Sequence, residues 1–323
     1  MAKLSFLIRH HNEDLSIIEP LFQSLNIQVG IDWNDIEIVL SDDTGKTYQY
    51  DKILDRCPNI KNRIIFVNSI LNSTLHNKFQ GIYNSSSEYF TCWDCDDRLY
   101  DCFTLQKMLT ALEQNRGKDF ILFRRTNVKH NVDTKNIPHF VLTGIICKKE
   151  FIIKNDIRPV RLAQGEDVYL DTVIHMIKEK SYIIIPEIVY LYIDREDSVW
   201  HDKKNLEKNL YKPSLDMLYY VIQYHNDHLN TTDFPIERFW ECLPYFYWKL
   251  QEYANANVNN FTENVKNVII NAEQEIKNFY LQVVNKTFFQ NHWKLQYISL
   301  SKTSNKETFH QWLNRVFNLD LGE

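Results

Sequence analysis

The sequence predicts an α/β fold, with a Rossmann-like and mostly parallel sheet, followed by a helical C-terminal domain. Over about the first 200 residues, short apolar runs typical of buried strands alternate with stretches of helical periodicity. Such alternation is typical of β-α-β units, whose right-handed crossovers place helices on both faces of a sheet. From about residue 205 onward, long helical periodicities replace this pattern. We therefore expect one domain over residues 1–204 and a second over residues 205–323.

The elements follow from the pattern in chain order. Apolar runs predict strands at residues 4–8, 36–40, 64–67, 89–93, 120–123, 143–147 and 181–193. A one-sided apolar pattern predicts a helix between Ile17 and Leu25, and because Pro20 lacks a backbone N–H, this helix is expected to start late. Further helices are expected at residues 166–178, 215–224, 236–253 and 265–284.

The composition excludes several classes of protein. The 323 residues are 44% hydrophobic and 14% aromatic, which is enough for a sizeable core and excludes disordered and fibrous chains. Only seven glycines are present, and neither a G-x-G-x-x-G fingerprint nor a phosphate-binding P-loop motif occurs. The formal charge of −5 argues against a protein that binds nucleic acid mainly through a basic surface.

The N-terminus and the cysteines indicate a cytoplasmic protein. One short apolar run precedes charged residues, so no signal peptide is predicted, and no apolar stretch is long enough to span a bilayer. Six cysteines in a chain of this length do not suggest a disulfide framework. Cys92 and Cys95 form a C-x-x-C pair, but no second pair follows at zinc-finger spacing, so we interpret them as ordinary thiols.

Three carboxylates gather where the fourth predicted strand ends. Asp94, Asp96 and Asp97 directly follow the apolar run 89–93. Like charges this close repel one another unless a cation is present, and in an extended segment Asp94 and Asp96 would point to the same side. Carboxylate oxygens suit Mg²⁺ or Mn²⁺, which can also bridge diphosphate oxygens. The cluster therefore predicts a metal site, with a solvated acidic turn as the structural alternative.

Two further acidic pairs lie at the ends of predicted elements. Asp42 and Asp43 follow the second strand, and ligands of such sheets collect at the carboxyl ends of the strands. These carboxylates can accept hydrogen bonds from a pyrimidine base, although an Asx-turn is the alternative. Glu166 and Asp167 follow Gly165 at a predicted helix start, where they can cap the helix or act as a general base.

Six motifs in this order resemble those of the family-2 glycosyltransferases with the GT-A fold, over roughly residues 1–204. They are Arg9-His10-His11-Asn12, Asp42-Asp43-Thr44-Gly45, Lys78-Phe79-Gln80-Gly81, the 94–97 cluster, Gly165-Glu166-Asp167, and Tyr192-Ile193-Asp194-Arg195 with Ser198. The resemblance implies inverting transfer of a hexosyl or N-acetylhexosaminyl group. The implied donor is a nucleoside diphosphate sugar, most often a UDP-sugar, used with Mn²⁺ or Mg²⁺. Residues 28–37 are also similar to glycosyltransferases encoded by bacteriophages.

The resemblance further implies a role for each matching residue. The residues implied in nucleotide binding are His10, Asp42, Asp43, Lys78, Asp94 and Arg195. The implied metal ligands are Asp94, Asp96 and His201. Asp167 is implied as the catalytic base, with Glu166 beside it. Lys78 takes the place of the family's usual arginine, and it lacks the planar two-pronged fork of that side chain.

Two other functions remain open at this point, a nucleotidyltransferase and a non-catalytic protein that binds nucleotide sugars. The acceptor hydroxyl is equally open among a glycan, a protein and a modified nucleobase. The helical domain carries an aromatic-rich stretch over residues 240–248, which is typical of a core or an interface. We expect this domain to bind the acceptor or to form a homo-oligomer.

Overall fold

The computed structural model describes ten ranges of the chain: 2–11, 13–42, 50–68, 73–127, 139–162, 165–193, 211–256, 263–283, 311–312 and 315–316. The chain divides into two compact units. The first comprises Met1–His201 with Tyr220–Asp233, and the second comprises Asp202–Tyr219 with Phe234–Glu323. The segment Tyr220–Asp233, which the sequence assigns to the helical domain, thus groups with the first unit.

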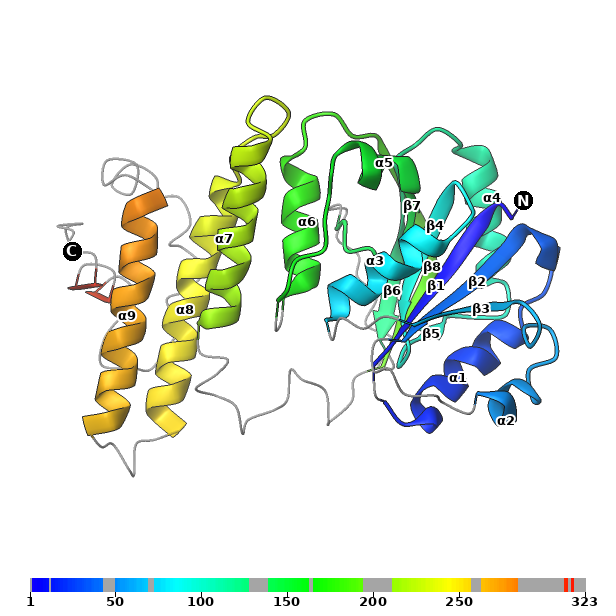
Figure 1. Cartoon of the computed structure of the whole chain (residues 1–323), viewed down its shortest axis with the longest axis horizontal. Coiled ribbons are helices and arrows are strands. Elements are labelled where there is room, and N and C mark those ends of the chain that lie inside the picture. The colour runs from blue at the N-terminus through cyan, green and yellow to red at the C-terminus, as the bar shows by residue number, and fades with distance from the viewer. Residues whose placement is uncertain are drawn as a thin grey trace. The chain divides into compact units, whose positions relative to one another are not determined.

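The first unit is built on a mixed sheet (Figure 1). Within the described ranges the strand order is β3-β2-β1-β4-β7-β6-β8-β5. The strands are β1 (Leu4–His10), β2 (Ile36–Asp42), β3 (Ile64–Asn68), β4 (Tyr89–Asp94), β5 (Arg98–Leu99), β6 (Phe120–Asn127), β7 (Ile146–Lys148) and β8 (Tyr182–Tyr192). The pairs β1–β2, β1–β4, β2–β3 and β6–β8 are parallel, whereas β7 and β5 pair antiparallel with their neighbours. The predicted α/β fold is confirmed, and the short β5 carries too little pattern to be predicted.

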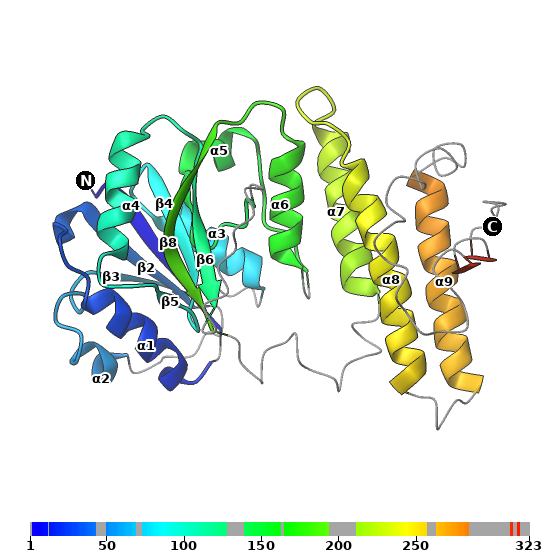
Figure 2. The same ribbon diagram turned by 180° about the vertical axis from the view of Figure 1, so that it is seen from behind.

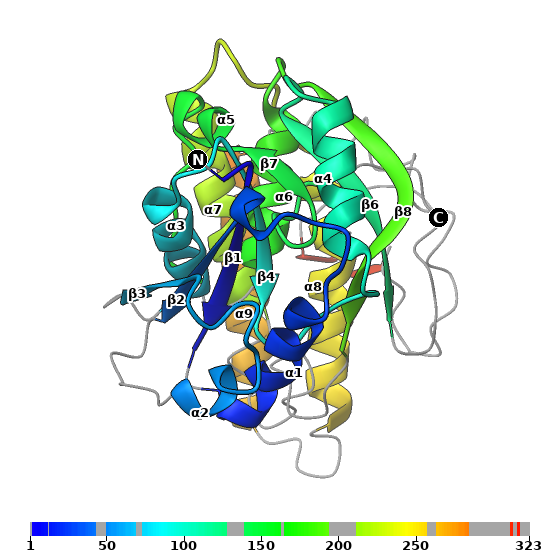
Figure 3. The ribbon, with the colours of Figure 1, turned by 90° about the vertical axis from the view of Figure 1, so that its right-hand side faces the viewer.

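Helices cover both faces of this sheet, as Figure 1 and the reverse view in Figure 2 show. The first unit contains α1 (Leu15–Asn26), α2 (Asp51–Leu54), α3 (Thr74–Asn84), α4 (Thr104–Gln114), α5 (Lys149–Lys154) and α6 (Glu166–Met176). Helix α3 packs on β1 and β2, while α4 contacts β8, and Figure 3 shows these two helices on opposite sides of β1 and β4. A 3₁₀ turn, η1 (Trp33–Asp35), precedes β2.

The later helices are α7 (Lys212–Asp227), α8 (Ile236–Ala256) and α9 (Glu263–Val283), close to the three predicted ones. Their periodicities identify the helical character of this part of the chain correctly. None of the helices in the described ranges is long and apolar enough to cross a membrane.

Helix α1 corrects one expectation, since Pro20 lies inside it and not in its first turn. The helix begins earlier because the Asp14 side chain accepts a hydrogen bond from the Ser16 N–H, at 2.8 Å, and thereby caps it. Pro20 removes one internal hydrogen bond. Burial of one face against the sheet, through residues such as Phe22 and Leu25, offsets that cost.

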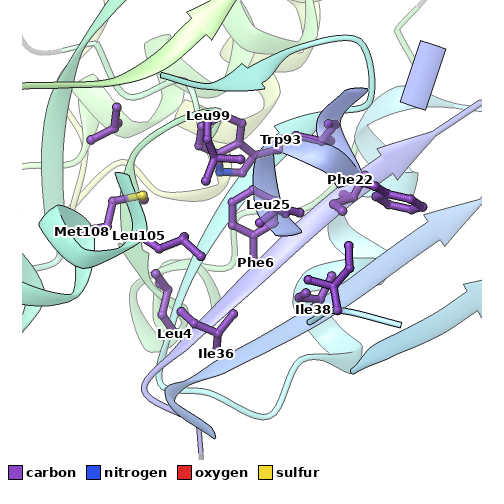
Figure 4. Packing of buried hydrophobic residues seen from close by; sticks show 14 of the residues in the cluster. Leu4, Phe6, Phe22, Leu25, Ile36, Ile38, Trp93, Leu99, Leu105 and Met108 are labelled. Atoms are coloured by element: carbon purple, nitrogen blue, oxygen red, sulfur yellow. The ribbon is translucent and has the colours of Figure 1, made fainter. Parts of the chain in front are cut away.

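The core lies between the sheet and helices α1, α2 and α4 (Figure 4). Along β1 the side chains alternate: Phe6 stacks on Trp93 of β4 with ring centroids 5.0 Å apart, while Leu7 faces α3. On that other face, a Cβ atom placed on Gly81 would lie 3.5 Å from the Leu7 Cβ, so α3 lies close against β1. This close packing carries the residues of α3 to the carboxyl end of the central strands.

Candidate active site

Parallel pairing brings the carboxyl ends of β2, β1 and β4 together at one rim. In the register of these strands His10 lies opposite Asp42, and Arg9 lies opposite Asp94. Ionisable residues thus end all three strands, although the strands themselves are largely buried. Rim positions of this kind are the usual ligand site of open α/β sheets.

Lys78 of α3 is the centre of the site. Its amine lies 3.1 Å from an Asp167 carboxylate oxygen, 3.6 Å from Asp94 and 4.0 Å from Glu166. The side chain is only 1% exposed, and the amine also donates to the Thr143 hydroxyl at 3.4 Å. Burial alone would lower the pKa of this amine, but the surrounding carboxylates, Asp167 foremost, raise it well above its usual value. Lys78 is therefore a permanently charged cation between carboxylates of two distant segments.

Glu166 and Asp167 lie in the first turn of α6, and this end of the helix faces the Lys78 amine. Gly165 precedes the helix with a φ of 80°, a left-handed conformation that glycine adopts readily. The Asp167 side chain is 39% exposed and that of Glu166 is 22% exposed. Burial, together with the adjacent Asp167 charge, raises the pKa of Glu166. Asp167 is thus the more accessible of the two carboxylates.

Arg9 is the second cation of the site. Its Nε donates to the Asp94 carboxylate at 3.0 Å. Burial alone would raise the pKa of Asp94, but Lys78 and Arg9 outweigh it and lower that pKa to about 2. The Asp94 carboxylate is therefore ionised and held between two positive side chains.

The chain turns immediately after Asp94, and this corrects the expectation of an extended segment. The Asp97 N–H donates to the Asp94 carbonyl at 3.2 Å. Asp96 therefore lies in a turn, and it does not continue the strand that ends at Asp94. The Asp97 carboxylate accepts hydrogen bonds from the Tyr190 hydroxyl and, at 2.9 Å, from the Ile193 N–H. Burial, with Asp94 and Asp96 nearby, raises the pKa of Asp97 to about 8. Asp97 thus ties the end of β4 to the end of β8.

A second set of polar groups surrounds His10. Its Nδ1 lies 3.0 Å from the Tyr50 hydroxyl and its Nε2 lies 3.1 Å from the Glu13 carbonyl oxygen. Burial lowers the pKa of His10. Within the described ranges, the His10, Glu13 and Cys95 side chains bring three potential metal-ligand atoms within 4.8 Å of one another. The predicted ligands Asp94 and Asp96 do not belong to this group.

The structure gathers part of the predicted site. The Lys78 amine lies among the carboxylates of Asp94, Glu166 and Asp167. His10 and Asp42 end the neighbouring strands. Asp96 is half-buried in the turn after β4. Predicted residues outside the described ranges are Asp43, Arg195 and His201, with the motif residues Asn12, Thr44, Gly45, Asp194 and Ser198.

Sequence reasoning did not assign a role to Arg9, Thr143 or Tyr190. Arg9 carried a usable signal, because it is a charge at the end of a buried strand whose parallel neighbour ends in Asp94. Thr143 and Tyr190 carried none, since an isolated hydroxyl in an apolar run is common in any sheet.

Comparison with known proteins agrees with this geometry. The sequence matches the family model "Glycosyl transferase family 2" over residues 5–182, which is more than half of the chain. No curated protein sequence matches this chain.

Two solved structures are similar in fold. One is S. aureus TarS 1–349 in complex with UDP-GlcNAc, with a TM-score of 0.60, 16% identity, and coverage of 86% of this chain and 81% of that one. The other is the mannosyltransferase PcManGT from Pyrobaculum calidifontis in complex with GDP-Man and Mn²⁺, with a TM-score of 0.51 and 12% identity. That match covers 91% of this chain and 88% of that chain.

Proposed function

The chain belongs to glycosyl transferase family 2, and from this premise we propose that it catalyses an inverting, metal-dependent glycosyl transfer. The proposed donor is a nucleoside diphosphate sugar, preferably a UDP-sugar, that carries a hexosyl or N-acetylhexosaminyl group. The proposed acceptor is a hydroxyl of a glycan, a protein or a modified nucleobase. The UDP-GlcNAc and GDP-Man bound in structures of similar fold support the donor class.

The nucleotide is proposed to lie over the ends of β1 and β2. Asp42 is buried at the end of β2, directly across from His10, and its carboxylate can accept a hydrogen bond from the N–H of a pyrimidine. Asn77 of α3 donates to the His10 carbonyl at 2.9 Å and so holds this strand end in place. A rigid pair of strand ends is a suitable platform for a flat base.

The acidic turn after β4 fits a divalent cation by the chemistry of its donors. Asp94, Asp96 and Asp97 place three carboxyl groups within four residues, and Mg²⁺ and Mn²⁺ prefer such oxygen ligands. Because Asp94 is engaged by Arg9 and Lys78, we assign the role of metal ligand to Asp96. The bound ion would supply positive charge to the departing diphosphate.

Asp167 is proposed as the general base. It is the more exposed carboxylate of the pair, so an incoming hydroxyl can reach it. It would accept the proton of that hydroxyl while the bond to the sugar forms on the face opposite the diphosphate, which inverts the anomeric centre. The Lys78 amine donates to this carboxylate at 3.1 Å and fixes its position.

Lys78 contributes mainly by holding these groups together. Its buried amine lies among three carboxylates, so we assign it to orientation of Asp94 and Asp167 and not to direct contact with the diphosphate. Arg195 stays the proposed cation for the diphosphate.

One observation carries the proposal, namely the single amine that joins Asp94, at the donor end, to Asp167, at the acceptor end. The test is to incubate the protein with UDP-, GDP- and dTDP-sugars, with and without Mn²⁺. Release of the nucleoside diphosphate is followed, and the anomeric configuration of the product is read by NMR. We expect Mn²⁺-dependent release from one donor class and an inverted product. Retention of configuration, or absence of release from every donor, would contradict the proposal.

A further inference from the structure

Tyr190 of β8 is a buried tyrosine beside the acidic turn 94–97, and no step of the proposed reaction uses it. Its side chain is buried, and its hydroxyl donates to one oxygen of the Asp97 carboxylate. The other oxygen of this carboxylate accepts from the Ile193 N–H at 2.9 Å. Asp97 is only 3% exposed, so each of its oxygens has a donor near the end of β8. The last residue of the acidic turn is thus anchored to another strand.

Asp96, the proposed metal ligand, lies between two anchored residues. On one side, Asp94 ends β4 and accepts from the Arg9 Nε at 3.0 Å. On the other side, the Asp97 N–H closes the turn by donating to the Asp94 carbonyl at 3.2 Å. The Arg98 guanidinium also donates to the main-chain carbonyls of Asp96 and Asp97, at 2.9 Å and 3.0 Å. The main chain at Asp96 is therefore fixed from both sides, which limits the directions that its side chain can take.

The ring of Tyr190 is held as closely as its hydroxyl. It packs against Gly144, where an added Cβ atom would lie 2.7 Å from the Tyr190 Cδ2. Gly144 has a φ of 70°, a left-handed conformation that glycine adopts readily. The Trp93 ring also packs on the tyrosine, with ring centroids 4.7 Å apart. A side chain at position 144 would displace the ring, and the hydroxyl would move with it.

Arg125 connects this tyrosine with the carboxylates around Lys78. Its guanidinium lies 5.7 Å from the centroid of the Tyr190 ring and donates to the Thr143 carbonyl at 2.8 Å. The hydroxyl of the same threonine accepts from the Lys78 amine at 3.4 Å. The contacts around Tyr190 therefore extend from the acidic turn to the amine at the centre of the site.

We propose that Tyr190 is a positioning residue for the divalent cation. By holding Asp97, it keeps the acidic turn in the form in which Asp96 can bind Mn²⁺ or Mg²⁺. Metal ligands are oriented by hydrogen-bonded groups behind them, and loss of such a group typically weakens metal binding by about 10- to 100-fold. This inference rests on the proposed function, since it concerns the cation that Asp96 is assigned to hold.

The test is direct binding of Mn²⁺ to the protein without donor, measured by EPR. Tyr190→Phe keeps the ring against Gly144 and removes only the hydroxyl, so the Mn²⁺ dissociation constant should rise about tenfold or more. Tyr182→Phe makes the same change at a 42% exposed tyrosine of the same strand and should leave this constant unchanged. Urea denaturation without Mn²⁺ measures the effect of each variant on stability. An unchanged dissociation constant in Tyr190→Phe, whatever its stability, would overturn the proposal.

Variants of Asp97 separate positioning from direct binding of the cation. In Asp97→Asn, the new amide can accept from the Ile193 N–H through its oxygen and donate to the Tyr190 hydroxyl through its nitrogen. Asp97→Asn should therefore bind Mn²⁺ more tightly than Asp97→Ala, which loses both hydrogen bonds. Equal losses of Mn²⁺ affinity in the two variants would mean that the carboxylate itself binds the cation, and would overturn the positioning role.

The binding measurement also keeps this inference apart from the proposed function. Mn²⁺ binding that depends on Tyr190, in a protein that releases nucleotide from no donor, would contradict the glycosyl transfer and support the positioning role. Mn²⁺-dependent turnover with the same Mn²⁺ requirement in the wild type and Tyr190→Phe would support the transfer and overturn the positioning role. A wild type that binds no Mn²⁺ would overturn the positioning role as well.

Discussion

The Lys78 amine lies 3.1 Å from Asp167, a residue 89 positions later in the chain, and is almost entirely buried. The same amine is 3.6 Å from Asp94 at the end of β4. One cation thus connects the first turn of α6 with the acidic end of a central strand. This arrangement couples the stability of the site to its chemistry, because the carboxylates proposed to act in the reaction depend on the same buried cation.

Asp167→Asn should reduce kcat by about 10²- to 10⁴-fold, the usual contribution of a general base. The donor KM should change little, since the amide has the same shape and Asp167 is not assigned to the nucleotide. Steady-state kinetics with the best donor provides the measurement. Asp55→Asn, at an exposed carboxylate paired with Lys61, is the control. Near-normal turnover by Asp167→Asn would remove Asp167 from the role of base.

Lys78→Met should lower the free energy of unfolding by about 3 kcal/mol, because it removes the buried cation that the partly buried carboxylates of Glu166 and Asp167 share. Combining it with Asp94→Asn should cost less than the sum of the two single losses, since both substitutions break the same ion pair. Urea denaturation of the wild type, both single variants and the double variant gives the coupling energy. Lys107→Met breaks a more exposed pair with Asp101 and should cost at most about 1 kcal/mol. Additive effects of Lys78→Met and Asp94→Asn would mean that the two residues are not coupled.

Metal dependence should be sensitive to Asp96. Treatment with EDTA should abolish nucleotide release, and added Mn²⁺ should restore it. Asp96→Asn should raise the Mn²⁺ concentration needed for half-maximal activity by about tenfold or more, as expected when a charged ligand is lost. Manganese titrations of the wild type, Asp96→Asn and the Asp55→Asn control measure this. Activity that survives exhaustive chelation would exclude an essential divalent ion.

Glu166 should make the stability of the protein depend on pH. Its pKa is raised in the folded state by burial and by Asp167, so its stabilising contribution is present below pH 4.5, the ordinary pKa, and is lost as the pH rises through the folded value. Between pH 4.5 and pH 8, the free energy of unfolding of Glu166→Gln should therefore rise relative to that of the wild type. Urea denaturation at several pH values tests this.

Glu113→Gln is the control for that experiment, with the opposite sign. The pKa of Glu113 is lowered by Lys3. The free energy of unfolding of the wild type should therefore rise relative to that of Glu113→Gln as the pH rises through 4.5. A Glu166→Gln difference that stays constant over this range would contradict the raised pKa.

Local pattern accounts for most of the strands. Period-2 and continuous apolar runs predicted β1, β2, β3 and β4 almost to the residue, because buried strands need such runs whatever surrounds them. Helix α3 was not predicted, since its buried side chains include Asn77 and Lys78 and its apolar pattern is correspondingly weak. A helix whose buried face carries polar groups to a site is therefore hard to recognise from hydrophobic periodicity.

The sequence by itself determined the α/β class, the family motifs, and the fact that carboxylates end the second and fourth strands and begin a later helix. Only the tertiary structure decided which of these charges meet: Arg9 with Asp94, Lys78 with Asp167, and Asp97 with Tyr190. It also decided that the chain turns after Asp94 and that Tyr190 packs closely against Gly144. The physical reason is the separation in sequence over which each kind of information acts. Periodicity reports the environment of a few consecutive residues, whereas contacts between residues nearly a hundred positions apart depend on strand register and on how closely each helix packs against the sheet.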